Sequence, residues 1–137
     1  MENCFSVHMD EKELNQMSPL ALAHCGDAVF ELLARSFLCV HGGVRADDLH
    51  RKTVALVSAG AQAARAERMT PMLTEWEMGW YKRGRNVHTH AVPKSATPSQ
   101  YARATGLECL FGALYLTGQT DRANELFLRT MEEDHGI

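Results

Sequence analysis

Long apolar runs are missing from this sequence of 137 residues. None approaches the ~20 apolar residues of a membrane-spanning helix, so we expect no membrane association. The N-terminus lacks a basic region followed by an apolar one, so we expect no secretory signal. The four cysteines include no Cys-x-x-Cys pair, which argues against a structural zinc site and favours free thiols in a reducing compartment. These absences predict a cytoplasmic protein.

Alternation of apolar and polar residues, the mark of a strand, is also absent. Helix start signals are frequent instead: Ser18-Pro19, the capping box Thr74 to Glu77, and Thr97-Pro98. The 45% hydrophobic content is sufficient for a core. We therefore predict an all-α fold of six to seven helices in a single domain, residues 1–137, with residues 1–9 as a loose N-terminal end.

Acidic residues are missing from one segment, Met78 to Leu107, which carries five of the 14 basic residues. The rest of the chain holds nine basic residues and all 17 acidic ones, a net charge of −8. A basic segment on an acidic protein indicates a local anion-binding surface, with nucleic acid as one candidate ligand. A solvated loop without function is the alternative.

Two apolar helical stretches each carry an acid in their middle. Asp27 lies within residues 20–33, whose leucines and alanines we expect to supply packing surface, and Glu108 is the only acid in residues 101–116. Small residues beside both acids allow the two helices to approach closely. The carboxylates can then meet and share a hard divalent cation, Mg²⁺, whose bound water can attack a phosphodiester. Alternatively, each acid is an ordinary salt-bridge partner or lies on the helix surface.

The basic segment is expected to form a loop over residues 85–97, after a helix that ends near residue 83. The candidate RNA-binding side chains are Lys82, Arg83, Arg85, Asn86 and Lys94. Cations in such a loop can follow phosphates and sugar hydroxyls without reading sequence, which is how proteins hold double-stranded RNA. No aromatic residue lies between Lys82 and Gln100, which argues against a single-strand stacking surface.

These motifs together resemble a known family. Gly26-Asp27-Ala28-Val29 is similar to the signature helix of the ribonuclease III catalytic domain, and Thr105 to Leu116 is similar to its second acidic helix. The order and spacing of the motifs, including Lys82-Arg-Gly-Arg-Asn86, resemble the Mini-III ribonucleases most closely. These are catalytic domains without the double-stranded-RNA-binding domain. The resemblance spans about residues 11–130.

The resemblance implies specific roles. Asp27 corresponds to the essential catalytic aspartate and Glu108 to the essential metal-binding glutamate, while Lys82 to Lys94 is expected to contact RNA. The family fold is all-α and acts as a homodimer with the signature helices near the interface. The implied activity is Mg²⁺-dependent endonuclease cleavage of double-stranded RNA that leaves 5′-phosphate ends. For the Mini-III group the implied substrate is precursor 23S ribosomal RNA, and a ribosomal protein helper stays open.

Two positions depart from the pattern of the larger ribonuclease III enzymes, which carry carboxylates where this chain has Ala23 and Thr105. Their loss leaves two acids and motivates a rival hypothesis, a non-catalytic RNA-binding or ribosome-associated protein on the same fold. A third reading, an unrelated small-molecule metal hydrolase, leaves the acid-free basic segment unexplained. His24 and Glu31, each one turn from Asp27, are interpreted as structural, with support of the site through water as the alternative.

Overall fold

Helices make up most of the described part of the protein. The computed structural model describes residues 2–43, 45–87 and 94–135, with the backbone alone for residues 133–135. These ranges contain seven α-helices, one short 3-10 helix and no strand, which confirms the predicted all-α fold. None of the described helices combines the length and apolar character that crossing a bilayer requires. The elements are α1 (Glu11–Asn15), α2 (Pro19–Val40), α3 (Ala46–Val57), α4 (Ala59–Met69), η1 (Thr70–Met72), α5 (Glu75–Arg85), α6 (Pro98–Leu116) and α7 (Thr120–His135).

Local capping signals place the helix starts. The Ser18 hydroxyl accepts a hydrogen bond from the backbone of Ala21 at the start of α2, and Pro19 occupies the first helical position. Thr74 and Glu77 form a reciprocal capping box at the start of α5, as the sequence predicts. The end of α2 is followed by Gly42, whose φ of 131° suits glycine alone. Sequence-local chemistry therefore sets these boundaries.

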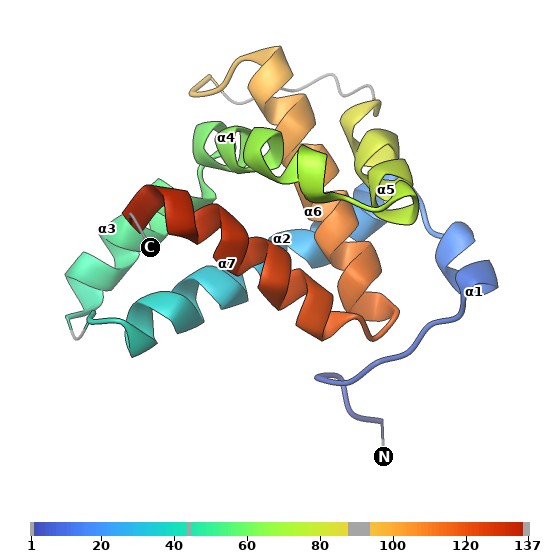
Figure 1. The fold of residues 1–137 in the computed structure, drawn as a ribbon, viewed down its shortest axis with the longest axis horizontal. Helices are drawn as coiled ribbons and strands as arrows, with labels where there is room; N and C mark the ends of the chain where they lie inside the picture. Colours follow the sequence, from blue (N-terminus) through green and yellow to red (C-terminus); the bar gives the residue numbers. More distant parts are fainter. Residues whose placement is uncertain (1, 44, 88–93, 136–137) are drawn as a thin grey trace.

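Helix α6 forms the centre of the molecule and packs against α2, α4 and α5. Every residue from Ala104 to Leu114 is buried except Glu108. Figure 1 shows α7 crossing in front of α2 and α6. Edge-to-face contacts of Phe30 with Phe111 (5.4 Å between ring centroids) and with Phe127 (5.5 Å) join α2, α6 and α7. Within the buried stretch of this interior helix, Glu108 is the one residue with partial access to solvent.

Glycines allow α6 to contact two neighbouring helices through its backbone. On the α2 side, a Cβ added to Gly26 would overlap the carbonyl of Glu108, and one added to Gly112 would overlap the carbonyl of Leu22. On the α5 side, a Cβ on Gly84 would lie 2.8 Å from the carbonyl oxygen of Thr105. The crossing of α2 over α6 is therefore fixed at the turn that carries Asp27 and Glu108.

Candidate active site

Asp27 and Glu108 meet where α2 crosses α6. Gly26, next to Asp27 in the chain, rests on the backbone of Glu108, so the two carboxyl groups are brought into hydrogen-bonding contact. Asp27 is exposed, whereas Glu108 is half-buried in α6. The two residues are 81 positions apart in the sequence and share one small region of the surface.

The environment of Glu108 disfavours its charged form. Burial raises the pKa of its carboxyl group, and the hydrogen bond and negative charge of Asp27 raise it further, to about 8. At neutral pH, without a cation, the pair therefore retains a proton. Two carboxylates forced together in this way either share a proton or are neutralised by a cation between them.

The donor set suits a hard divalent cation. Carboxylate oxygens are the ligands that Mg²⁺ prefers, and it commonly uses one or two of them with waters in the remaining positions. Among the residues that the structure describes, no group of three or more His, Cys, Asp or Glu side chains is placed to hold a metal ion. Asp27 and Glu108 thus offer a two-carboxylate site, open to water and substrate on the Asp27 side.

The neighbours of the pair add no further carboxylate. Ala23 is buried against the core, and the buried Thr105 donates its hydroxyl proton to the carbonyl of Tyr101 at 2.9 Å within α6. Glu31 forms an ion pair with Arg35 at 3.1 Å on the outside of α2. The sequence favours a core position for His24 as its structural role, and this prediction is wrong because His24 is exposed.

The basic residues lie at the end of a helix that extends two residues beyond its predicted end near residue 83. Helix α5 continues to Arg85, so Lys82, Arg83 and Arg85 form its last turn and Asn86 caps it. Cations are favourable there because the last turn carries the negative end of the helix dipole. Gly84 serves the packing of α5 on α6, where its absent Cβ leaves space for Thr105 and Cys109.

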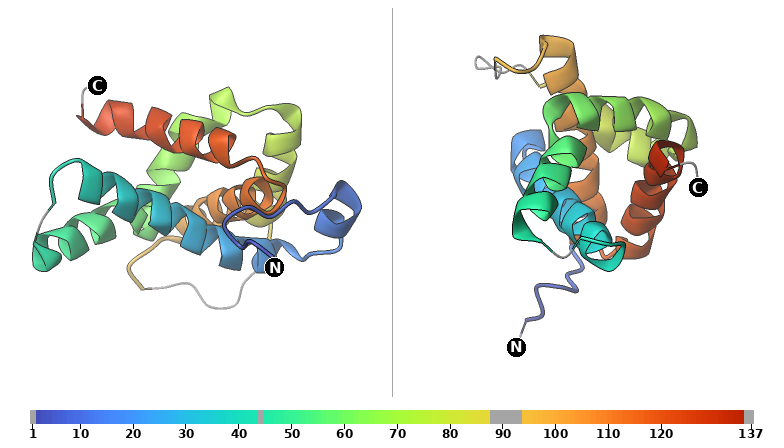
Figure 2. Two further views of the ribbon diagram at one scale, coloured as in Figure 1. Left: turned by 90° about the horizontal axis from the view of Figure 1, so that it is seen from below. Right: turned by 90° about the vertical axis from the view of Figure 1, so that its left-hand side faces the viewer.

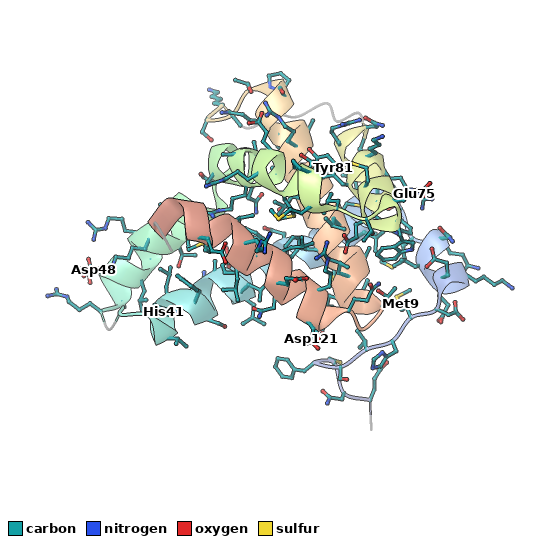
Figure 3. All side chains as sticks on the ribbon, in the orientation of Figure 1. Met9, His41, Asp48, Glu75, Tyr81 and Asp121 are labelled. Atoms are coloured by element: carbon teal, nitrogen blue, oxygen red, sulfur yellow. The ribbon has the colours of Figure 1, made fainter. Side chains whose placement is uncertain are left out.

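The cations of this last turn have different surroundings. Arg83 donates a hydrogen bond to the side chain of Asn15 at 3.1 Å, and its guanidinium lies 4.1 Å from the centre of the Trp80 ring. The guanidinium of Arg85 lies 5.7 Å from the centre of the Tyr81 ring, and its Nε–H donates a hydrogen bond to the side chain of Asn86. Tyr81 is labelled in Figure 3. Lys82 is exposed. Arg83 therefore connects α5 to Asn15, the last residue of α1, and no sequence pattern predicted this contact.

Helix α6 connects the basic turn to the carboxylates. Gly84 rests against Thr105 and Cys109, which flank Glu108 on α6, so α5 lies within about one helical turn of the carboxylate pair. Lys94 is exposed and precedes α6, whose first turn lies at the same end of the molecule as the end of α5 (Figure 1). Residues 88–93 of the expected RNA-binding segment lie outside the described residues.

The leucines and alanines of α2 are all predicted to supply packing surface, but several of them are exposed to solvent. Leu20 is 47% exposed and Leu32 is 56% exposed, and Ala28 is also exposed. These side chains are therefore accessible to solvent in the described part of the chain. Figure 2 shows the outer helices around α6 from two further directions. Sequence reasoning missed this exposed apolar surface because apolar residues occur on both faces of α2.

Comparisons with known proteins agree with this architecture. Residues 20–119 match the model of the ribonuclease III domain family. The chain is 47% identical over 110 residues to the Mini-ribonuclease 3 of Symbiobacterium thermophilum, covering 80% of this chain and 85% of the relative. It is 43% identical to the Mini-ribonuclease 3 of Enterococcus faecalis, covering 84% and 89%. A crystal structure of a Fusobacterium nucleatum protein superposes with a TM-score of 0.79 at 28% identity, covering 89% of this chain and 98% of that one.

Proposed function

The chain belongs to the ribonuclease III domain family and to its Mini-ribonuclease 3 branch, which makes it an endoribonuclease, and we propose that it cuts double-stranded precursor 23S ribosomal RNA. The observation that carries the catalytic assignment is the contact of Asp27 with Glu108 beside a basic helix end. The ribosomal target follows from the resemblance to the Mini-III group. We place the reaction in the bacterial cytoplasm, where the relatives named above would meet nascent ribosomal RNA.

Asp27 and Glu108 are the residues that would hold the metal ion in this proposal. A bound Mg²⁺ supplies an activated water and stabilises the leaving oxygen of the phosphodiester. The buried backbone of α6 holds Glu108 in place, and the glycine crossing holds Asp27 against it, so both carboxylates are preorganised. Glu108 must lose its proton to bind a cation, so metal binding releases a proton below about pH 8.

Lys82, Arg85, Asn86 and Lys94 are proposed to hold the phosphate backbone of the duplex, with a lesser share for Arg83 because of its contacts with Asn15 and Trp80. Each lost phosphate contact reduces the slope of log affinity against log salt by about one unit. A homodimer with the outer faces of α2 in contact is also part of the proposal. The exposed apolar face of α2 supports it, because solvent-exposed apolar patches commonly mark interfaces.

The test is cleavage of a long labelled RNA duplex, with and without Mg²⁺. Asp27→Asn and Glu108→Gln should each reduce cleavage by at least about 100-fold while RNA binding is retained, because an amide lacks the negative charge that would hold the metal ion. Glu31→Gln serves as the matched control on α2 and should cut normally. Cleavage that survives in both variants would contradict the assignment of the two carboxylates. Precursor 23S RNA as the better substrate over a generic duplex would support the ribosomal target.

A further inference from the structure

The basic last turn of α5 meets α6 at the level of Glu108. A Cβ added to Gly84 would lie 2.8 Å from the carbonyl oxygen of Thr105, and one added to Gly106 would lie 2.8 Å from that of Tyr81. The two helices are therefore in backbone contact on either side of the turn that leads to Glu108. A small displacement of the end of α5 would move its cations by the same amount relative to the carboxylate pair.

Three side chains form a row along the side of α5 that contacts α1. Trp76, Trp80 and Arg83 follow one another at intervals of four and three residues, so they lie on one side of the helix. The rings of Trp76 and Trp80 meet edge to face at 6.1 Å between centroids, and the Arg83 guanidinium lies 4.1 Å from the centre of the Trp80 ring. The row extends over about two helical turns and ends in the basic turn.

Helix α1 contacts both ends of this row. The indole N–H of Trp76 donates to the two carboxylate oxygens of Glu11 at 3.0 and 3.2 Å, and Arg83 donates to the side chain of Asn15 at 3.1 Å. Leu14, in the same short helix, is fully buried in the core. Figure 1 shows α1 beside α5. Because Leu14 fixes α1 to the body of the protein, α1 can hold α5 in place.

The partners of Arg83 suit a cation that must be held without being neutralised. A guanidinium is planar, so it can stack on the Trp80 ring while its N–H groups donate within the plane. The Asn15 side chain that accepts from it is an uncharged amide. The positive charge of Arg83 is therefore retained beside Lys82 and Arg85. A carboxylate in the place of Asn15 would hold the guanidinium and cancel its charge.

We propose that Arg83 is a positioning residue for RNA cleavage: Asn15 and the Trp80 ring hold its guanidinium, and Arg83 thereby holds the last turn of α5 at the level of Glu108. This inference rests on the proposed function, in which the cations of this turn hold the duplex. A phosphate bound there is then kept at a fixed distance from the carboxylates. Cleavage is sensitive to that distance, since a displacement of about 1 Å can reduce a rate by about 100-fold.

Two variants break the contact and keep the positive charge at position 83. Asn15→Ala removes the acceptor, and Arg83→Lys replaces the planar guanidinium by an ammonium that cannot stack and donate in the same way. The measurements are the single-turnover cleavage rate at saturating duplex RNA with Mg²⁺, the dissociation constant for the RNA, and the Tm. Each variant should cleave at least about 10-fold more slowly, with a dissociation constant within about two-fold of wild type. Wild-type rates in both variants would overturn the inference.

Two controls separate positioning from stability. Gln16→Ala removes an exposed amide next to Asn15 and should leave all three measurements unchanged. Trp76→Phe removes the N–H that Glu11 accepts and keeps an aromatic ring, so it loosens α1 two turns away from the basic turn. It should lower the Tm and leave the cleavage rate unchanged at a temperature where every variant is folded. If Trp76→Phe slows cleavage as much as Asn15→Ala does, the effect is one of general stability and the positioning role is wrong.

A double variant and a conservative variant test the contact itself. Asn15→Ala combined with Arg83→Lys should cleave no more slowly than the slower single variant, because both changes break one contact. Asn15→Asp keeps an acceptor for Arg83, so it should retain the wild-type rate at saturating RNA while it weakens RNA binding by cancelling the charge. Multiplied rate losses in the double variant, or a rate loss in Asn15→Asp equal to that in Asn15→Ala, would contradict the proposal.

Failure of this inference is distinguishable from failure of the proposed function. A wild-type protein that does not cleave duplex RNA with Mg²⁺ would overturn the proposed function together with the inference that rests on it. A wild-type protein that cleaves, beside Asn15→Ala and Arg83→Lys variants that cleave equally fast, would overturn the positioning role alone.

Discussion

Replacing Glu108 by glutamine is expected to stabilise the metal-free protein while abolishing cleavage. Burial, together with the hydrogen bond and charge of Asp27, raises the pKa of Glu108 from 4.5 to about 8. An acid whose pKa rises on folding holds its proton more tightly in the folded state, so the free energy of unfolding falls as pH rises from about 4.5 to 8. At about 1.4 kcal/mol per pKa unit, the wild-type protein loses about 3 kcal/mol at pH 7, and less than about 1 kcal/mol at pH 5.

Glu108→Gln cannot ionise and avoids this loss. In urea or thermal unfolding with EDTA, the variant should exceed wild type by about 3 kcal/mol at pH 7, or about 10 °C in Tm for a domain of this size, with a much smaller gain at pH 5. The control Glu31→Gln removes an exposed ion pair with Arg35 and should change stability by less than about 1 kcal/mol. Mg²⁺ should stabilise wild type and leave the variant unaffected. A variant no more stable than wild type at pH 7, or a gain independent of pH, would refute the reasoning.

Three further outcomes are expected. Gly26→Val forces the α2 and α6 backbones apart and should cost more than about 3 kcal/mol in the free energy of unfolding and remove cleavage; wild-type stability in this variant would contradict the backbone contact. Burial opposes ionisation of Glu77, yet the hydrogen bonds that it accepts from Arg122, at 2.8 and 3.0 Å, lower the pKa of its carboxyl group. The stability that this pair contributes is therefore present above about pH 4.5 and is lost as the pH falls through the lowered pKa. Arg122→Met should destabilise at neutral pH by about 3 kcal/mol and remove that acid-side dependence, which urea titrations at several pH values will test. Lys82→Gln should reduce the slope of log RNA affinity against log salt and leave the stability unchanged. Arg83→Gln should lower the Tm, because Arg83 contacts α1 through Asn15 and packs on Trp80. Equal salt slopes and equal Tm values for the two variants would contradict this difference in surroundings.

Local chemistry made most helices predictable. Ser18 with Pro19, and Thr74 with Glu77, satisfy backbone N–H groups within a few residues of themselves, so their effect does not depend on the rest of the fold. The family resemblance could be drawn for a similar reason, since it depends on the order and spacing of short motifs. The helix predicted to end near residue 83 extends two residues further, to Arg85, because Gly84 weakens helix propensity in isolation whereas in the fold the packing of Gly84 on α6 supports the helix.

The exposed face of α2 was beyond sequence reasoning. Leu20 and Leu32 have the same apolar character as Leu22 and Phe30, yet the first two face solvent and the latter two are fully buried. A helix with apolar residues on both faces does not state which face its own chain covers. The packing of α6 against one side of α2 decides that, and it leaves Leu20 and Leu32 exposed.

By itself the sequence determined the helical fold, the two lone acids and the basic segment, because propensity, capping and composition act locally. Only the tertiary structure decided that the carboxyl groups of Asp27 and Glu108 are in contact. The two acids are 81 residues apart in the chain. Their contact depends on the close approach of α2 and α6, which Gly26 and Gly112 allow where the two helices cross. The raised pKa of Glu108 arises from that contact and from burial in α6, and neither is a property of any segment alone.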